Sequence, residues 1–480
     1  MRNRTKHAIH CLLFISWVAV FVAVTRPEFP KNITTDEQER SWYNAFLIPI
    51  DIIRMTSHLL LLPQLIFGCI GLLAYSAFQR SVKLKNSPCV APFICFRVVT
   101  RGTYPKLLKE TLSKNVRTCQ QTGIENYWFE VVTDNQLNLK PQSRLVREIV
   151  VPGSYQTLKG SLYKARALQY CLEDGVSPVT KGQWIVHLDE ESLLTPDAVR
   201  GILNFCSAGT SDFGQGMITY ASDTIVSWFC TFADSLRVAD DLGKLRASFN
   251  LLRRPYFSWK GSYVVARYSA EKLVGFDHGF EGSIAEDCFF AMVSMRYGLS
   301  YGYIDGVVHE KSPFSVDDLI KQRRRWFQGI WMTIHSNAIP YKHKALLTAC
   351  VYGWAALPVL IFCFMLPSSG YFGSLTTYDM ILNQIFIAIN VYQYAYGAFI
   401  SFKEKYSSDR RMLLLCVIGA VCVLPFNALV EATAVLYGLI SRKIGFHIIQ
   451  KSISSTMLDQ KEPRASIFAC YRRFNNIRFL

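Results

Sequence analysis

The sequence is poor in charge for its length and contains no paired-cysteine motif. Only 18% of its 480 residues are charged while 50% are hydrophobic, which excludes a disordered chain and disfavours a purely soluble one. None of the 14 cysteines forms a Cys-x-x-Cys pair, so there is no sign of a zinc module or a disulfide framework. Acids are scarce, 36 against 52 basic residues; the resulting charge of +16 suits anionic lipid, phosphate-bearing substrates or nucleic acid.

Five apolar stretches are each about long enough to cross a bilayer. They are residues 9–25, 56–78, 345–366, 380–402 and 412–439. The first follows Arg2, Arg4 and Lys6 and is interpreted as a retained anchor rather than a signal peptide, because no clear cleavage site follows it. The fourth carries four amide side chains, so a buried core helix is an alternative there. Pro425 interrupts the fifth, which is therefore either one span or a hairpin or re-entrant segment.

Basic residues predict the orientation of these segments. Arg2, Arg4 and Lys6 precede the first, and Arg80, Lys83 and Lys85 follow the second, so both flanks are expected in the cytosol. The chain then divides into a membrane region at 1–87, a cytosolic domain at 88–335 and a second membrane region at 336–480. An odd number of spans would place the tail in the lumen, whereas its basic residues favour the cytosol, so its side stays open. Because much of the positive charge flanks spans, a nucleic-acid partner is not expected.

The block at 88–335 alternates between strand and helix patterns. Strands are predicted at 93–99, 128–133, 148–151 and 184–188. Helices are predicted at 105–119, at 160–172 and from residue 196 onward. This alternation favours an α/β domain with a mostly parallel sheet covered on both faces. Ligands of such sheets bind at the carboxyl ends of strands, so residues directly after strands are the candidates for a site.

Two of the predicted strands end in acids. Asp134 follows the strand at 128–133, and Asp189, Glu190 and Glu191 follow the strand at 184–188. Asp189 and Glu191 are two residues apart, so both can point the same way. Two carboxylates suit Mg²⁺ or Mn²⁺ when a diphosphate completes the shell. The alternative is a solvated acidic turn that caps the next helix.

A further acid pair, Glu286 and Asp287, precedes the apolar run at 288–295. Acids at this position either cap a helix or supply a general base that takes a proton from an acceptor hydroxyl. Trp259 is a candidate for stacking on a sugar ring, with packing in the core as the alternative.

A basic segment runs from Gln322 to Trp326, behind a capping box formed by Ser315 and Asp318. Gln322, Arg325 and Trp326 share one helical face, so Arg325 can clamp a phosphate and Trp326 can pack on an acceptor ring. Arg323 and Arg324 would point elsewhere, toward lipid headgroups. The alternative is a plain basic helix beside the membrane.

Taken in order, these motifs resemble the inverting family 2 glycosyltransferases. The pattern is an early Asp, an Asp-x-Asp-like motif, a Glu-Asp pair and Gln-x-x-Arg-Trp beside a membrane, and it covers about residues 88–335. Here the metal motif ends in Glu191, where many members have Asp. The resemblance implies a GT-A-type nucleotide-sugar-binding domain inserted between transmembrane helices. It also implies a divalent metal cofactor, Mn²⁺ or Mg²⁺.

The resemblance also implies roles for individual residues. Donor binding falls on Asp134, Lys164, Arg166 and Asp189. Metal ligation falls on Asp189 and Glu191. Catalysis falls on Asp287 as the base, with Gln322, Arg325 and Trp326 as the clamp. Acceptor binding falls on Trp259 and Trp326.

The layout of the chain and several stretches narrow the resemblance to the egghead-type β-1,4-mannosyltransferases. Those stretches are residues 160–168, 184–191, 257–266 and 322–329. This group implies GDP-mannose as donor, glucosylceramide as acceptor, and an endoplasmic reticulum or Golgi membrane with the catalytic domain facing the cytosol. Ceramide glucosyltransferase and a processive polysaccharide synthase are rival enzymes with the same motifs. An inactive membrane scaffold is the rival outside enzymes.

Overall fold

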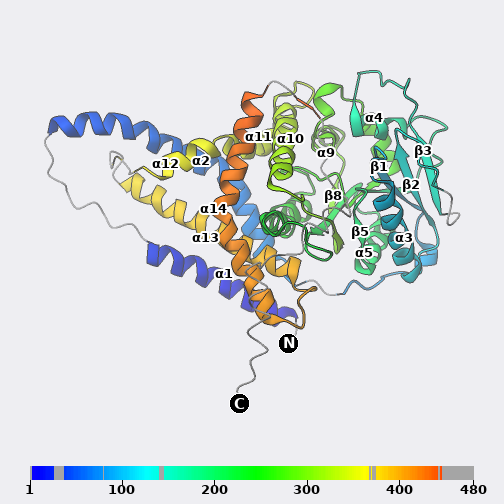
Figure 1. Cartoon of the computed structure of the whole chain (residues 1–480), viewed down its shortest axis with the longest axis horizontal. Helices are drawn as coiled ribbons and strands as arrows, with labels where there is room; N and C mark the ends of the chain where they lie inside the picture. Colours follow the sequence, from blue (N-terminus) through cyan, green and yellow to red (C-terminus); the bar gives the residue numbers. More distant parts are fainter. Residues whose placement is uncertain are drawn as a thin grey trace, which may run out of the picture.

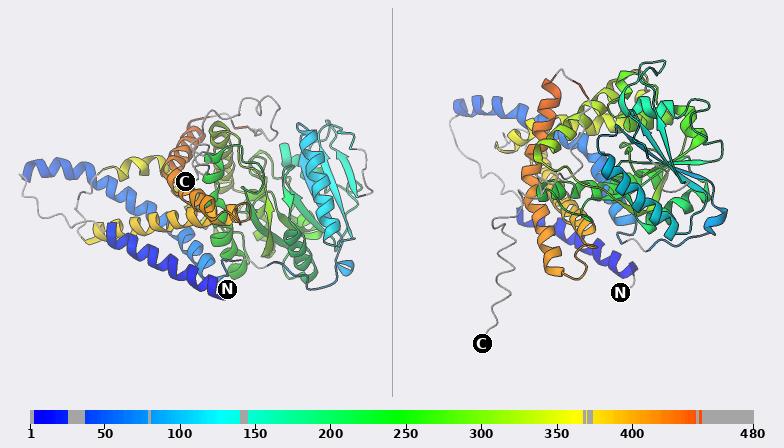
Figure 2. Two further views of the ribbon diagram at one scale, coloured as in Figure 1. Left: turned by 60° about the horizontal axis from the view of Figure 1, so that its bottom comes forward. Right: turned by 45° about the vertical axis from the view of Figure 1, so that its right-hand side comes forward.

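A computed structural model describes residues 3–25, 37–78, 81–139, 145–366, 369, 374–441 and 444–445, with side chains described except at 37–45 and 374. Figure 1 shows a domain built around a sheet and a group of long helices that extend away from it. The views in Figure 2 show the same two regions.

The domain contains one eight-stranded sheet in the order β3-β2-β1-β4-β7-β6-β8-β5. The strands are β1 Ile94–Thr100, β2 Tyr127–Thr133, β3 Val146–Val150, β4 Trp184–Leu188, β5 Leu193–Leu194, β6 Phe213–Thr219, β7 Val264–Arg267 and β8 Tyr301–His309. The four predicted strands are confirmed as a parallel set, β3-β2-β1-β4. Strand β7 runs antiparallel to both β4 and β6, and β5 runs antiparallel to β8, so the sheet is mixed. The other six strands run in one direction, as expected for a mostly parallel sheet.

Helices cover both faces of the sheet, as the alternating pattern predicts. Residues of α3 (Pro105–Gln121) and α5 (Pro196–Ala208) pack in the core on one face. Residues of α4 (Tyr163–Tyr170), α8 (Tyr268–Val274) and α9 (Glu286–Ser294) pack in the core on the other. The helix predicted at 160–172 is shorter than expected: it begins only at Tyr163, after Gly160 with its positive φ angle of 76°, and ends at Tyr170. The site helix α10 spans Val316–His335.

The core behind α9 is shared with helices of the apolar region. It includes Leu347 of α11 (Tyr341–Ala355) and Val435 of α14 (Arg410–Ile440) beside Phe290 of α9 and Phe327 of α10. Short helices α6 (Trp228–Ala233) and α7 (Ser235–Asp240) and two π-helical turns at Asp241–Leu245 and Ser248–Leu252 lie between the sheet and this region. The sheet domain and the apolar helices therefore pack as one body.

Four helices of the described chain are long and apolar enough to cross a membrane. They are α1 (Asn3–Thr25), the Phe46–Ala74 part of α2 (Glu37–Ala74), the Leu375–Phe402 part of α13 (Ser374–Phe402), and α14. The pair α11 and α12 (Leu357–Phe364) is a fifth candidate, bent by 52°. Helix α14 continues through Pro425, so the hairpin considered for this stretch is wrong.

Candidate active site

A cavity of about 330 Å³ opens where strands β1, β2 and β4 end. Nearly all the residues predicted for the site contribute to its wall, although they come from segments up to about 190 positions apart. These wall residues are Asp134, Lys164, Asp189, Glu191, Trp259, Asp287, Gln322, Arg325 and Trp326. Arg166 is not part of the wall but contacts it through Asp134. The parallel arrangement of β1, β2 and β4 explains this convergence, because it brings their carboxyl ends to one edge.

Lys164 connects the acids on the two sides of the cavity. Its Nζ donates to Asp189 Oδ1 at 3.0 Å and to the Gly261 carbonyl at 3.1 Å, and lies 3.6 Å from Glu286 Oε1. Burial opposes the charge of Lys164, but the carboxylates of Asp189, Glu286 and Asp287 outweigh it and raise the pKa of the ammonium. The lysine thus holds these acids close together despite their like charge.

Asp287 lies half-buried in the cavity wall at the start of α9. Burial first, and the carboxylate of Glu286 second, raise the pKa of Asp287 to about 7, against the opposing effects of Lys164, the Cys288 N–H and Arg325. That N–H donates to Asp287 Oδ1 at 2.7 Å. Asp287 therefore fits both interpretations of the acid pair. It lies in the first turn of a helix, as a capping residue does, and it faces the cavity, as a general base must.

Gly261 is a part of the site that the motifs did not single out. A Cβ at this position would lie 3.1 Å from Asp287 Oδ2 and 3.2 Å from Lys164 Nζ. Neighbouring Ser258 holds a φ of 102°, which non-glycine residues rarely adopt. The backbone between Ser258 and Gly261 is thus shaped to approach the two charged groups closely.

At the mouth of the cavity, Asp134 pairs with Arg166. The Nη2 of Arg166 lies 2.6 Å from Asp134 Oδ1, and its Nη1 donates to the carbonyls of Pro152 and Tyr155. The side chain of Asp134 remains 43% exposed, so it is open to a ligand on its other side. Two residues predicted to bind the donor thus form one unit.

Helix α10 begins as the capping box predicts, since the Asp318 N–H donates to Ser315 Oγ at 3.1 Å. Gln322, Arg325 and Trp326 then face the cavity together. Two guanidinium groups lie over the Trp326 ring, with the Cζ atoms of Arg323 and Arg237 at 4.4 and 4.7 Å from its centroid. Arg237 lines the cavity and was not foreseen.

The expectation that Arg323 points toward lipid headgroups is wrong. Its side chain is buried and makes two ion pairs, to Asp234 Oδ1 at 2.7 Å and to Glu431 Oε1 at 2.8 Å. A buried guanidinium needs such partners to offset the loss of hydration. Arg324 instead contacts α14, over the Tyr437 ring and at the Ser441 hydroxyl.

Trp259 packs chiefly in the core. It is 4% exposed, and its ring lies 5.5 Å from those of Phe213 and Phe290, measured between centroids. Trp259 also contributes to the cavity wall, so its predicted contact with an acceptor sugar stays a prediction.

The acids of the site match a divalent metal only in combination with a phosphate ligand. Among the described residues, no three His, Cys, Asp or Glu side chains gather closely enough to hold an ion by themselves. Asp189 and Glu191 are hard oxygen donors in one turn of the wall. One or two carboxylates together with substrate phosphates are the usual ligands of Mg²⁺ in transfer enzymes. The donor set therefore fits a hard cation that binds together with a diphosphate.

Glu310, directly after β8, is another acid of the wall that the motifs did not identify. It accepts a hydrogen bond from Ser192 Oγ at 2.7 Å. Burial and then the charge of Asp189 raise the pKa of Glu310. Glu310 could have been predicted from the sequence by its position directly after a strand, as Asp134 was.

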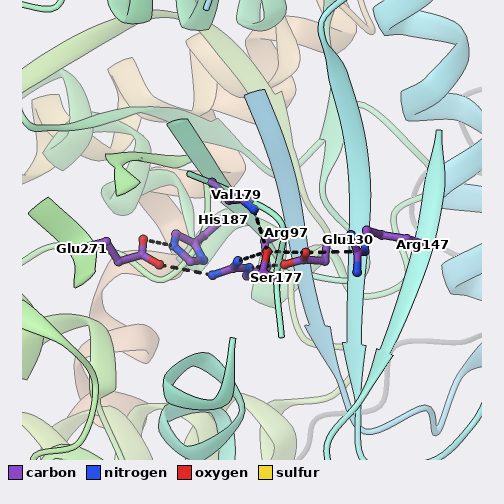
Figure 3. Close-up of polar contacts among 7 residues, drawn as sticks. All are labelled: Arg97, Glu130, Arg147, Ser177, Val179, His187 and Glu271. Carbon is purple, nitrogen blue, oxygen red and sulfur yellow. Dashed lines mark hydrogen bonds and ion pairs between the residues drawn. The ribbon is translucent and has the colours of Figure 1, made fainter. Parts of the chain in front are cut away.

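Beneath the cavity, a row of polar side chains crosses the sheet in register. Arg97 of β1 is paired with Glu130 of β2 on one side and with His187 of β4 on the other. Arg97 makes ion pairs with Glu130 at 2.7 Å and with Glu271 of α8 at 3.3 Å, and Glu271 lies 2.7 Å from His187 Nε2. Figure 3 shows this continuous row, which extends to Arg147 of β3.

This row fixes the strands directly under the site. His187 is two residues before Asp189, and Glu130 is four residues before Asp134, so each shares a strand face with a cavity residue. Because Arg97, Glu130 and Glu271 are fully buried, each depends on the others for its charge to be tolerated. Little in the sequence points to this row, since Arg97, Glu130 and His187 stand singly within apolar strands and Glu271 lies on a separate helix.

Comparison with known proteins places the chain in a family. A family model described as glycosyl transferase family group 2 matches residues 184–401. The β-1,4-mannosyltransferase bre-3 of Caenorhabditis elegans is 45% identical over 463 residues, covering 95% of this chain and 100% of the relative. The β-1,4-mannosyltransferase egh of Drosophila melanogaster is 46% identical over 464 residues, covering 94% and 99%.

Among solved structures there is a distant likeness to the mannosyltransferase PcManGT from Pyrobaculum calidifontis in complex with GDP-Man and Mn²⁺. It has a TM-score of 0.45 and 15% identity, and covers 83% of this chain and 100% of the other. The family assignment rests on the close relatives, which match almost from end to end. This chain is a glycosyltransferase that belongs to the β-1,4-mannosyltransferases of glycosyltransferase family group 2.

Proposed function

We propose that this enzyme transfers mannose from GDP-mannose to glucosylceramide, with inversion at the anomeric carbon to form a β-1,4 linkage. The family assignment supports the sugar and the linkage, and the resemblance described above supports the donor and acceptor. The observation that carries the proposal is the position of Asp287: a carboxyl with a pKa of about 7 that shares a cavity with Lys164 and Arg325. A single displacement needs one such base and cations for the leaving group.

In the proposed reaction, Asp287 takes the proton of the acceptor hydroxyl as that oxygen attacks the anomeric carbon. The attack comes from the face opposite the diphosphate, so an α-linked donor gives a β-linked product. A pKa near 7 suits this task, because the carboxylate is both available and sufficiently basic at cellular pH. Burial and then the charge of Glu286 raise the pKa of Asp287, whereas Lys164 and Arg325 lower it and so favour the ionised form.

Charged side chains in and beside the wall would bind the donor. Arg325 is assigned to the diphosphate through charge-assisted hydrogen bonds, and the pair of Asp134 and Arg166 to the nucleoside end. Asp189 and Glu191 would hold Mn²⁺ or Mg²⁺ when the donor binds. Such an ion, when bound, neutralises charge on the leaving diphosphate.

The membrane arrangement is part of the proposal. A glycolipid acceptor would stay in the bilayer while its headgroup enters the cavity from the cytosolic side of an endoplasmic reticulum or Golgi membrane. The basic residues at the N-terminal end of α1 and after α2 support this orientation. The extent 88–335 for the cytosolic domain remains part of the same proposal.

The test is an assay of purified enzyme in lipid vesicles with several radiolabelled nucleotide sugars and glycolipid acceptors. We expect transfer only from GDP-mannose and only to glucosylceramide, lost with EDTA and restored by Mn²⁺ or Mg²⁺. Transfer of glucose to ceramide, or formation of a polymer, would replace the proposal with one of the rival activities. Absence of transfer from every donor tested, by protein that binds none of them, would favour the scaffold.

A further inference from the structure

Helix α14 contacts the sheet domain along most of its length. Gly419 faces the ring of Phe232 in α6, and Val423 and Val430 pack with Leu319 of α10. Farther along, Gly438 lies against Phe327 of α10, and its carbonyl accepts a hydrogen bond from Gln328 Nε2 at 3.1 Å. The contact therefore extends over at least 438 − 419 = 19 residues.

That length is incompatible with α14 crossing the bilayer. At about 1.5 Å per residue, 19 residues span about 29 Å, close to the roughly 30 Å of a hydrocarbon core. If α14 stood upright, α6 and α10 would stand beside it in hydrocarbon. The exposed ion pair between Asp317 and Lys321 on α10 would then lie in lipid, at a cost that such pairs do not offset.

The direction of α14 also differs from that of the other long apolar helices. Figure 1 shows α1, α2 and α13 extending away from the sheet domain, while α14 runs across them at the boundary between the two regions. The same arrangement is visible in the second panel of Figure 2. Helix α12 ends beside Arg54 of α2, which donates to the carbonyls of Cys363 and Leu366.

Arg54 is 74 − 54 = 20 residues from the end of α2 at Ala74, about 30 Å along a helix. Arg54 therefore lies about one hydrocarbon thickness from the Ala74 end of α2. Because α12 ends beside Arg54, the bent pair α11 and α12 covers the same distance and counts as one crossing. With α1, α2 and α13, this makes four crossings.

The outer face of α14 is an apolar stripe. Its members are all exposed and follow one another at steps of three, four or seven residues, which keeps them on one side of a helix. They are Leu415, Ile418, Cys422, Phe426, Leu429, Leu436 and Ile440. The opposite face, with Cys416, Ala420 and Val435, is buried against the protein. Arg410 and Arg411 at the start of the helix are exposed and can reach phosphate groups.

We propose that α14 lies in the plane of the membrane, with the stripe from Leu415 to Ile440 buried in the leaflet on the side of the sheet domain. The partner is the lipid bilayer itself, because the stripe is continuous with a region whose other long helices are apolar enough to span. Glu431 on the same helix pairs with Arg323 of α10, so an ion pair connects α14 to the helix that carries Gln322, Arg325 and Trp326. With four crossings, both ends of α14 stay on the side of the sheet domain.

The test places a cysteine before and after α14, as Ser408→Cys and Ile444→Cys, in the full-length enzyme in sealed microsomes. A membrane-impermeant maleimide is added, and labelled sites are identified by peptide mass so that native cysteines are told apart. Lys31→Cys, between α1 and α2, serves as the control from the opposite side. We expect both sites flanking α14 to react without detergent to at least about 80% of their labelling in detergent, while Lys31→Cys reacts only in detergent.

Labelling of Ser408→Cys and Ile444→Cys from opposite sides would overturn the proposal, because it would show that α14 crosses. If both react only in detergent and Lys31→Cys reacts without it, α14 is still in-plane but the cytosolic orientation fails. The placement of α14 and the proposed function are thus tested separately. Each variant is used only if it matches the wild-type protein in expression and elutes as a single peak in gel filtration, and Ser407→Cys and Gly445→Cys are the replacements where one does not.

Discussion

Asp287 illustrates how a residue acquires a role from its surroundings rather than from its type. An aspartate in the first turn of a helix would ordinarily be a strong acid, stabilised by the helix dipole. Burial and Glu286 reverse that tendency and bring the pKa to about 7, while Lys164 and Arg325 limit the change. The same atoms that crowd the carboxyl therefore make it a suitable base.

Replacing this carboxylate by an amide should separate binding from chemistry. Asp287→Asn keeps the size and most hydrogen bonding of the side chain but removes its basicity. We expect turnover to fall roughly 10²–10⁴-fold, the usual contribution of a positioned base, while donor affinity is retained. Initial rates and calorimetric titration with the nucleotide sugar measure the two quantities. Glu281→Gln, an exposed acid nearby, is the matched control, and wild-type rates in Asp287→Asn would remove Asp287 from the mechanism.

The raised pKa also predicts the pH dependence of the enzyme. Below about pH 7 the Asp287 carboxyl holds its proton and cannot act as a base, so kcat/KM should fall as pH is lowered through that value. Because kcat/KM reports groups of the free enzyme, the ligand-free pKa is the relevant one. A pH–rate profile from 5 to 9 measures it. A profile that is flat down to pH 5 would show that no group of this pKa controls the reaction.

Arg325 and Arg324 are adjacent but should respond differently to substitution. Arg325 faces the cavity, so Arg325→Ala should weaken donor binding as well as turnover, and Arg325→Lys should restore only part because lysine lacks the planar fork. Arg324 is bound to Tyr437 and Ser441, so Arg324→Ala is the matched control and should bind donor normally. Equal donor affinities in the Arg325 and Arg324 variants would contradict the assignment.

At the scale of elements, α10 is held by ion pairs to two neighbouring parts of the chain. Arg323 joins it to Asp234 at the α6–α7 junction and to Glu431 of α14. Removing Arg323 would take the cation from Glu431 and would leave the buried Asp234 with Arg237 as its remaining ion-pair partner. The helix that carries Gln322, Arg325 and Trp326 therefore depends on an ion pair outside the cavity.

This dependence predicts a large loss of stability. Arg323→Met should destabilise the protein by roughly 3–5 kcal/mol, as expected when one partner of a buried pair is removed. Lys321→Met, two residues away on the exposed side of α10, should leave stability nearly unchanged. Thermal unfolding in detergent gives the comparison. If the two variants melt together, the Arg323 network does not hold the helix.

Across the whole molecule, the sequence predicted what is local and missed what depends on distant partners. Strands β1 to β4 were recognised because they are short runs rich in β-branched and aromatic residues. Most cavity residues were recognised because they follow strands or share a helical face, whereas Lys164 was identified through the family resemblance. The antiparallel β7, only four residues long, carries no local mark of its direction. The buried state of Arg323 could not be foreseen either, because Glu431 lies 431 − 323 = 108 residues away.

The membrane helices likewise show that the sequence predicts local features but not those that depend on distant partners. Each apolar stretch was found from its length and composition, but those properties do not distinguish a crossing helix from one that lies in the leaflet. The distinction comes from what packs beside α14, namely Phe232, Leu319 and Phe327 of the sheet domain. The four crossings that we propose would place the basic tail and the N-terminus on one side, which would resolve the conflict between span number and charge.

The central claim is that the cavity around Asp287 performs an inverting mannosyl transfer. The most direct measurement is NMR of the glycolipid formed by the purified enzyme from GDP-mannose and glucosylceramide, with Asp287→Asn run in parallel. We predict a new mannose linked to O4 of glucose with the β configuration, and at least about 100-fold less of it with the variant. An α-linked product, or equal product from the variant, would contradict this account of the site.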